Sequence, residues 1–119
     1  MLFIKKSNIH GFGVFTDIDI DEDTIIDFCY IQKLDKEDHF TISNYHYVHD
    51  NERYLILGIP FYVNHSNIPN CKLIKDKNEL GFDILKTKSI KKINKGEEIT
   101  VLYFEGVVIW LLQYLSIYS

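Results

Sequence analysis

Cysteine is scarce in this sequence, which contains only Cys29 and Cys71 among 119 residues. At most one disulfide could form, and the two cysteines are too far apart for a Cys-x-x-Cys zinc motif. We therefore predict no bound metal. Low cysteine content is typical of proteins in a reducing compartment, so we expect an intracellular protein that is not secreted.

Clustered positive charge is also missing. The formal net charge is −4, and Arg53 is the only arginine. Nonspecific nucleic-acid binding depends on clustered Lys and Arg side chains that displace counterions. The composition therefore argues against direct nucleic-acid binding and favours a cationic partner.

No stretch of the sequence is long and apolar enough for a membrane span. Residues 1–4 are apolar, but Lys5 and Lys6 follow at once, so there is no signal-peptide pattern. The other apolar run, residues 107–118, is roughly 12 residues long, and spanning a bilayer takes about 20. We expect no membrane segment.

The chain does have enough apolar material for one packed domain over residues 1–119. It is 46% hydrophobic and 14% aromatic, and a chain of this length needs no disulfide or metal to bury a core. Short apolar stretches between turns predict a mostly β fold of several small sheets. Strands are expected at 24–31, 54–58, 61–63 and 78–85, and a short extended piece at 45–49. The alternating segment 16–23 predicts a half-exposed strand that runs into an acidic turn, and residues 86–95 a basic connection.

Residues 107–118 differ from the rest of the sequence because they would be apolar on nearly every side as a helix. Such a helix must be buried. In so small a domain it would cover a site, form a dimer interface, or do both.

Two polar groups suggest metal binding, but each has a simpler explanation. His39, His46 and His49 have no helix to place them on one face, so exposed histidines are the expected outcome. The acidic run at 17–23 lacks the glycine and final glutamate of a calcium loop, and a solvated face is expected.

Three further segments carry the functional signal: Gly11-Phe12-Gly13, then Asn64-His65-Ser66, and residues 96–103, which read Gly-Glu-Glu-Ile-Thr-Val-Leu-Tyr. Each has an ordinary reading alone. Gly-x-Gly can be a tight turn or bulge, Asn-His-Ser can end a strand, and a tyrosine after an apolar strand can be core packing. In this order and spacing, however, they resemble the SET-domain protein lysine methyltransferases, and the resemblance covers nearly the whole chain.

This resemblance implies a β-clip-like SET fold with a C-terminal pseudoknot and a short C-terminal helix. It implies S-adenosylmethionine as cofactor and a lysine side chain as substrate. Glu98 is expected to organise a loop by hydrogen bonding, with no catalytic step. The implied catalytic residues are Tyr103 and Tyr45; the implied cofactor-binding residues are Gly11, Phe12, Gly13, Tyr45, Asn64 and His65; and the implied substrate-channel residues are Tyr45, Tyr47 and Tyr103. For Tyr47, core packing is an equal alternative.

The sequence also departs from the family pattern. Asn67 stands where many members carry a zinc-binding cysteine, and the tail has no cysteine, so no post-SET zinc module is expected. Residues 104–106, Phe-Glu-Gly, replace the usual continuation after Tyr103, which leaves a catalytically inactive peptide-binding or scaffold module as the alternative function.

The compact chain is similar to viral SET-domain methyltransferases, which implies a homodimer acting on a histone H3 tail. The absence of alanine and the excess of lysine over arginine indicate an adenine- and thymine-rich genome, which suits a viral origin. A histone substrate would place the protein in the nucleus, or wherever chromatin lies.

Overall fold

The computed structural model describes residues 1–35 and 46–102, without the side chain of His46. The described strands are β1 (Leu2–Lys6), β2 (Phe12–Thr16), β3 (Ile25–Lys33), β4 (His46–His49), β5 (Glu52–Leu57), β6 (Asn64–His65), β7 (Cys71–Lys77), β8 (Asp83–Ser89) and β9 (Glu98–Val101), and a 3-10 helix, η3 (Ile59–Tyr62), lies between β5 and β6. The prediction of a mostly β chain with several sheets is confirmed. The predicted C-terminal helix and the threading of a pseudoknot fall on residues outside this description.

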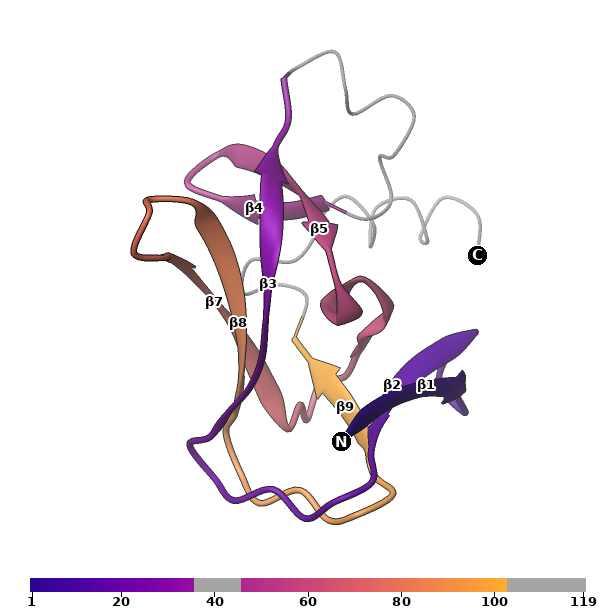
Figure 1. Cartoon of the computed structure of the whole chain (residues 1–119). Helices are drawn as coiled ribbons and strands as arrows, with labels where there is room; N and C mark the ends of the chain where they lie inside the picture. The colour runs from indigo at the N-terminus through magenta and orange to yellow at the C-terminus, as the bar shows by residue number, and fades with distance from the viewer. Residues whose placement is uncertain (36–45, 103–119) are drawn as a thin grey trace.

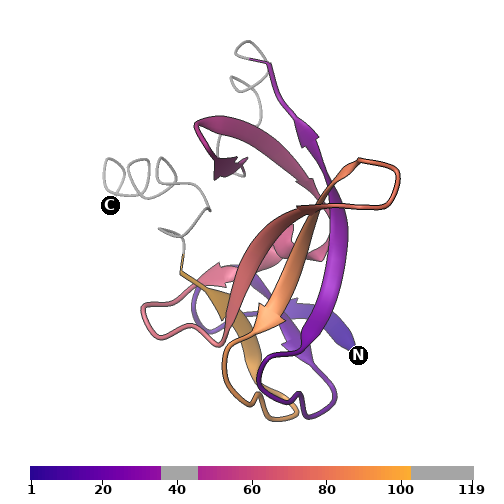
Figure 2. The same cartoon turned by 90° about the vertical axis from the view of Figure 1, so that its left-hand side faces the viewer.

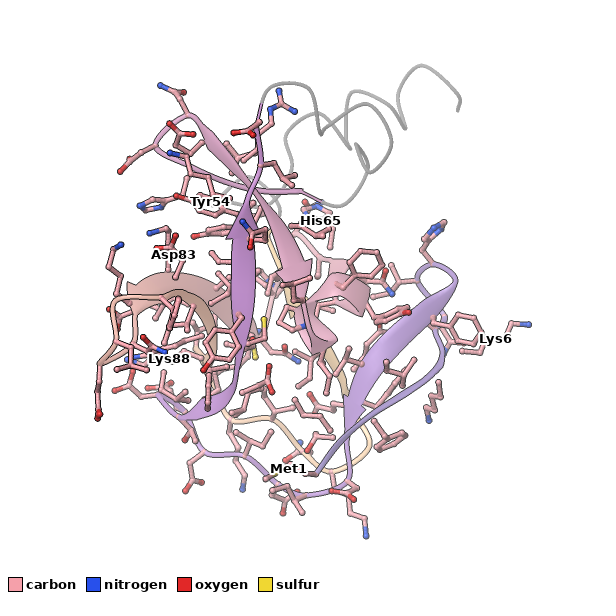
Figure 3. All side chains as sticks on the ribbon, turned by 45° about the horizontal axis from the view of Figure 1, so that its top comes forward. Met1, Lys6, Tyr54, His65, Asp83 and Lys88 are labelled. Carbon is pink, nitrogen blue, oxygen red and sulfur yellow. The ribbon has the colours of Figure 1, made fainter. Side chains whose placement is uncertain are left out.

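Two sheets make up the described part of the molecule (Figure 1). The smaller has the order β1-β2-β9-β6, and the larger has the order β4-β5-β3-β8-β7. Every pairing between these strands is antiparallel except β6 with β9, which is parallel. Figure 2 shows β3, β7 and β8 curving together as one extended layer. In Figure 3, Asp83 and Lys88 lie on the side of the large sheet, and Lys6 projects from the β1–β2 hairpin.

The core lies between the sheets and takes its side chains from both. Val14, Leu85, Ile93 and Ile99 are fully buried, and Val101 is nearly so. Apolar residues on alternate positions of strands point to the same face, so each sheet can supply one apolar face to this core.

Three predicted elements differ in the structure. Residues 61–63 do not form a strand, because Pro60 sits in the first turn of η3 and η3 includes Phe61 and Tyr62. In the alternating segment 16–23, Thr16 ends β2, and residues 17–23 form a loop that makes a single isolated bridge, Ile20 to Ile93, although Ile20 is buried.

The third difference concerns β8, which begins at Asp83 where the prediction has a strand from residue 78, and which continues through residues 86–89 of the predicted basic connection. Leu85, Thr87 and Ser89 point into the core, while Lys86 and Lys88 form ion pairs with Asp76 and Asp23. The segment alternates with period two, as expected for a half-buried strand.

Candidate functional site

The short strand β6 brings Asn64 and His65 beside β9. Asn64 pairs with Thr100 and His65 with Val101, and the Ser66 amide donates to the Val101 carbonyl at 2.9 Å. The Asn-His-Ser segment and the Gly-Glu-Glu-Ile-Thr segment, some thirty residues apart in the sequence, are therefore neighbours in the small sheet.

The Asn64 side chain joins these two segments to the glycine loop. Its amide nitrogen donates to the carbonyl oxygens of His10 at 3.0 Å and Phe12 at 3.1 Å, and to Oε2 of Glu98 at 2.8 Å. The side chain is only 7% exposed. Three acceptors share two amide hydrogens, so Nδ2 is fully used by the protein. The carbonyl oxygen Oδ1 makes no hydrogen bond with the described residues.

Glu98 is tied to the same loop from the other side. Its Oε1 accepts a hydrogen bond from the Ser7 hydroxyl at 2.7 Å. Ser7 Oγ in turn accepts from the amides of Ile9 at 2.8 Å and His10 at 3.3 Å, and the Ser7 amide donates to the Gly11 carbonyl at 2.8 Å. The expectation that Glu98 organises the loop by hydrogen bonding is confirmed.

Gly11 and Gly13 each require glycine, but for different structural reasons. Gly11 adopts a φ of +47°, in the left-handed region that disfavours residues with a Cβ. At Gly13 the reason is space: a Cβ would lie 2.3 Å from Glu98 Oε2 and 3.1 Å from the Ser7 Cβ. The loop and the Glu98 carboxylate are therefore in direct contact.

Sequence reasoning missed two residues of this arrangement. Ser7 precedes the glycine loop, and a serine just before the chain turns is a typical cap for loop amides. Asn70 lies directly before β7, is buried and holds β9 in place. Its Nδ2 donates to the Glu98 carbonyl at 2.8 Å, and its Oδ1 accepts from the Thr100 amide at 2.9 Å. No local pattern in the sequence distinguishes this asparagine from an ordinary turn residue.

The predicted tyrosines are placed only in part. Tyr45 and Tyr103 lie outside the described residues. Tyr47 is 3% exposed and belongs to the core, with its ring centroid 6.3 Å from that of Tyr54 and 6.2 Å from that of His49. Burial raises the pKa of the Tyr47 phenol. This position fits the packing alternative, and a role in a substrate channel stays a prediction.

The other polar candidates are dispersed. The ring of His65 lies near Asn67, with Nε2 and Oδ1 3.1 Å apart, and its predicted contact to adenine through the backbone stays a prediction. His49 is partly exposed next to Asp50, and His39 lies outside the described ranges. Within residues 1–35 and 46–102, no three potential metal-ligating side chains come together. Cys29 and Cys71 are free and buried, and burial raises their thiol pKa to about 11 and about 12.

Comparison with known proteins identifies the family. The family model of the SET domain matches residues 11–104. The chain belongs to the SET-domain family. This match includes the glycine loop, the Asn64 strand and β9, which are the elements joined by the hydrogen bonds of Asn64 and Glu98.

Solved structures support the same SET-domain assignment. A Plasmodium falciparum protein described as a candidate histone methyltransferase superimposes with a TM-score of 0.76 at 29% identity, over 86% of this chain and 91% of that one. A comparison with curated proteins found no match. Together, the family and this neighbour support a place among the protein lysine methyltransferases.

Proposed function

We propose that this chain is a protein lysine N-methyltransferase that uses S-adenosylmethionine and acts on a basic peptide such as a histone H3 tail. The observation that carries the proposal is the Asn64 side chain, whose amide joins the glycine loop, β6 and β9. These are the three segments that carry the family resemblance.

The residues present suit a cationic nucleoside cofactor. A Cβ at Gly11 would meet no atom within 4 Å, so a ligand could approach the main chain closely there, whereas the Glu98 carboxylate occupies the corresponding space at Gly13. The carbonyls of His10, Gly11 and Phe12 are already hydrogen-bonded within the protein. Asn64 Oδ1 is therefore the polar atom we expect to accept a hydrogen bond from the cofactor. His65 would add contacts through its backbone. When bound, S-adenosylmethionine would supply the methyl group as an activated sulfonium substituent.

The chain's own contribution to the reaction would be alignment and exclusion of water. A lysine amine has a solution pKa near ~10.4, so only about 0.1% of it is neutral at pH 7.4, a deficit of roughly 4 kcal/mol. An aromatic passage would disfavour the ammonium form by desolvation. Tyr45, Tyr47 and Tyr103 are proposed to line it, and the Tyr103 hydroxyl to orient the amine. A phenol pKa of about 10 makes Tyr103 a poor general base at neutral pH.

A basic tail is the substrate class that the surface charge favours. Residues 17–23 form an exposed loop with five carboxylates, apart from buried Ile20. Asp17 pairs with the amino terminus and Asp23 with Lys88, but Asp21 and Glu22 form no ion pair with described residues. These side chains could attract a cationic peptide at long range. Histone binding would place the protein at chromatin.

A dimer is a separate part of the proposal. It is motivated by the apolar sequence of residues 107–118, which lie outside the described residues. Sedimentation that found only monomer at micromolar concentration would contradict it. Among the described residues, no helix is long and apolar enough to cross a membrane.

Methyl transfer to histones and H3 peptides, detected by mass spectrometry, tests the enzymatic function. Tyr103→Phe is expected to lower the rate on the order of 100-fold, because one hydroxyl that stabilises the transition state is lost. Tyr30→Phe is the matched control, since Tyr30 is 50% exposed on β3 of the large sheet. If Tyr103→Phe retained the wild-type rate, the proposed role of Tyr103 would be wrong.

The altered residues 104–106 make an inactive binding module the second candidate. Calorimetry separates the two functions. A chain that binds a histone peptide but has no affinity for S-adenosylmethionine would be a binding module and could not be the enzyme.

A further inference from the structure

We propose that Glu98 is a charge-selecting residue of the cofactor site, which favours the cationic S-adenosylmethionine over its neutral product, S-adenosylhomocysteine. The inference rests on the proposed function and adds a role to it. Glu98 would act through the electric field of its carboxylate and through the loop that it holds, and it takes no part in the transfer itself.

The hydrogen bonds around Glu98 fit an ionised carboxylate. Both of its oxygens accept: Oε1 from Ser7 and Oε2 from Asn64. The Ser7 hydroxyl must be the donor, because Ser7 Oγ already accepts from the amides of Ile9 and His10. A carboxylate that receives a donor at each oxygen needs no proton of its own.

No cation among the described residues neutralises this carboxylate. Both of its hydrogen-bond partners are uncharged, and Glu98 forms no ion pair with any residue in the described ranges. The side chain is partly buried, in contrast to its exposed neighbour Glu97. A carboxylate withdrawn from water without a counterion is costly to the folded protein. A cation that binds close to it recovers part of that cost.

The position of Glu98 places its field at the proposed cofactor site. The carboxylate lies against Gly13, where a Cβ would be 2.3 Å from Oε2. It also shares Asn64 with the carbonyls of His10 and Phe12. A ligand that contacts the main chain of this loop or Asn64 Oδ1 therefore binds near a carboxylate that no cation among the described residues neutralises.

The reaction changes the charge of the ligand. S-adenosylmethionine carries one net positive charge, from its sulfonium, ammonium and carboxylate groups. When the methyl group is transferred from sulfur to the lysine amine, the positive charge moves with it. The sulfonium becomes a neutral thioether, so the product carries no net charge. Glu98 would attract the first ligand and not the second, which favours exchange of product for fresh cofactor.

Calorimetric titration with both ligands tests this inference. The measured quantity is the ratio of the Kd of S-adenosylhomocysteine to that of S-adenosylmethionine. Glu98→Gln is expected to lower this ratio about tenfold relative to wild type, which corresponds to ~1.4 kcal/mol. The loss should be in affinity for the sulfonium ligand.

Three variants separate charge from structure. Glu97→Gln removes the same charge from an exposed position one residue away, and it should leave the ratio unchanged. Ser7→Ala removes a neutral donor to Glu98, so it should weaken both ligands by the same factor. Glu98→Asp keeps the charge, and its ratio should stay within about twofold of wild type even if both Kd values rise. This variant also serves as the test if Glu98→Gln does not fold.

The possible outcomes are distinct. Equal weakening of both ligands in Glu98→Gln would reduce Glu98 to a structural role and overturn the inference. A ratio that collapsed in Glu98→Asp would do the same, because the charge remains in that variant. If wild type bound neither ligand, the proposed function itself would fail.

Discussion

Gly13→Ala probes the contact between the glycine loop and Glu98 most directly. The added methyl group would lie 2.3 Å from Oε2, 2.8 Å from Cδ of Glu98 and 3.1 Å from the Ser7 Cβ. Gly13 does not have a positive φ, so alanine suits its backbone and the cost comes from contact alone. The carboxylate must move away from Gly13.

The cost follows from what Glu98 loses when it moves. Its hydrogen bonds to Ser7 and Asn64 both involve a charged acceptor, and such bonds contribute about 1.5–3 kcal/mol each before rehydration offsets part of the loss. Inserting a methyl group into a filled site typically costs about 1–3 kcal/mol. We expect Gly13→Ala to lower the free energy of unfolding by about 2–3 kcal/mol. For a chain of this size, that corresponds to a fall in Tm of roughly 8–12 °C.

Urea and thermal denaturation, followed by circular dichroism, measure this change. Gly11→Ala is the control in the same loop: a Cβ there meets no atom within 4 Å, and only the strain of its φ of +47° remains. That strain should cost about 1–2 kcal/mol. The double variant Gly13→Ala/Glu98→Ala separates the two effects, because without the carboxylate the alanine should cost under about 1 kcal/mol. Additive costs to within about 0.5 kcal/mol would refute the proposed contact.

Two further predictions concern stability. Asn70→Ala removes the hydrogen bonds to the Glu98 carbonyl and the Thr100 amide, and should lower the free energy of unfolding in urea by about 2–3 kcal/mol. Burial raises the pKa of Asp27 above its ordinary value of 3.8, so the folded state binds that proton more tightly, and the stability from this group falls as pH rises above 3.8. Asp27→Asn should therefore be more stable than wild type at about pH 7, by about 0.5–1 kcal/mol. The new amide can also donate to the hydroxyl of Thr87, its cross-strand partner, which has no hydrogen-bond partner among the described residues. Urea unfolding at about pH 3 should show a smaller gain, and an equal gain at both pH values would contradict the linkage.

Local pattern predicted most of the large sheet but not its limits. The strand predicted over 24–31 matches β3, in which Cys29 and Ile31 are buried while Phe28 and Tyr30 are exposed. In β8, buried positions alternate with Lys86 and Lys88, and these lysines give the segment the composition of a surface connection. Basic residues on the outward face of a strand are compatible with pairing, because their long side chains reach solvent or an acidic partner.

The strand predicted at residues 61–63 from their aromatic and β-branched content is wrong. These residue types favour strands, yet the proline at position 60 fixes a helical φ and begins a 3-10 turn. Strand propensity reflects packing on a pleated surface more than an intrinsic backbone preference, so tertiary context can override it.

The candidate site could be predicted only through family resemblance. Hydrogen bonds between Asn64 and residues 52 or 54 positions away leave no periodic trace in the sequence. Ser7 and Asn70 were missed for the same reason, since their partners Glu98 and Thr100 are distant along the chain. Short-range pattern cannot reveal a pairing of this kind.

The position of Glu98 is set by the core as much as by the site. Ile99 and Val101 are 0% and 2% exposed, so their burial fixes the register of β9. Glu98 directly precedes Ile99 in β9. The pairing of β9 with β2, in which Glu98 faces Phe15 and Ile99 faces Val14, holds the Glu98 carboxylate beside the glycine loop at the start of β2. A slip of one residue would exchange the two faces of β9 and carry the carboxylate away from Gly13. Packing defects at Ile99 should therefore weaken cofactor binding as well as stability, because one strand supplies both the core and the charge.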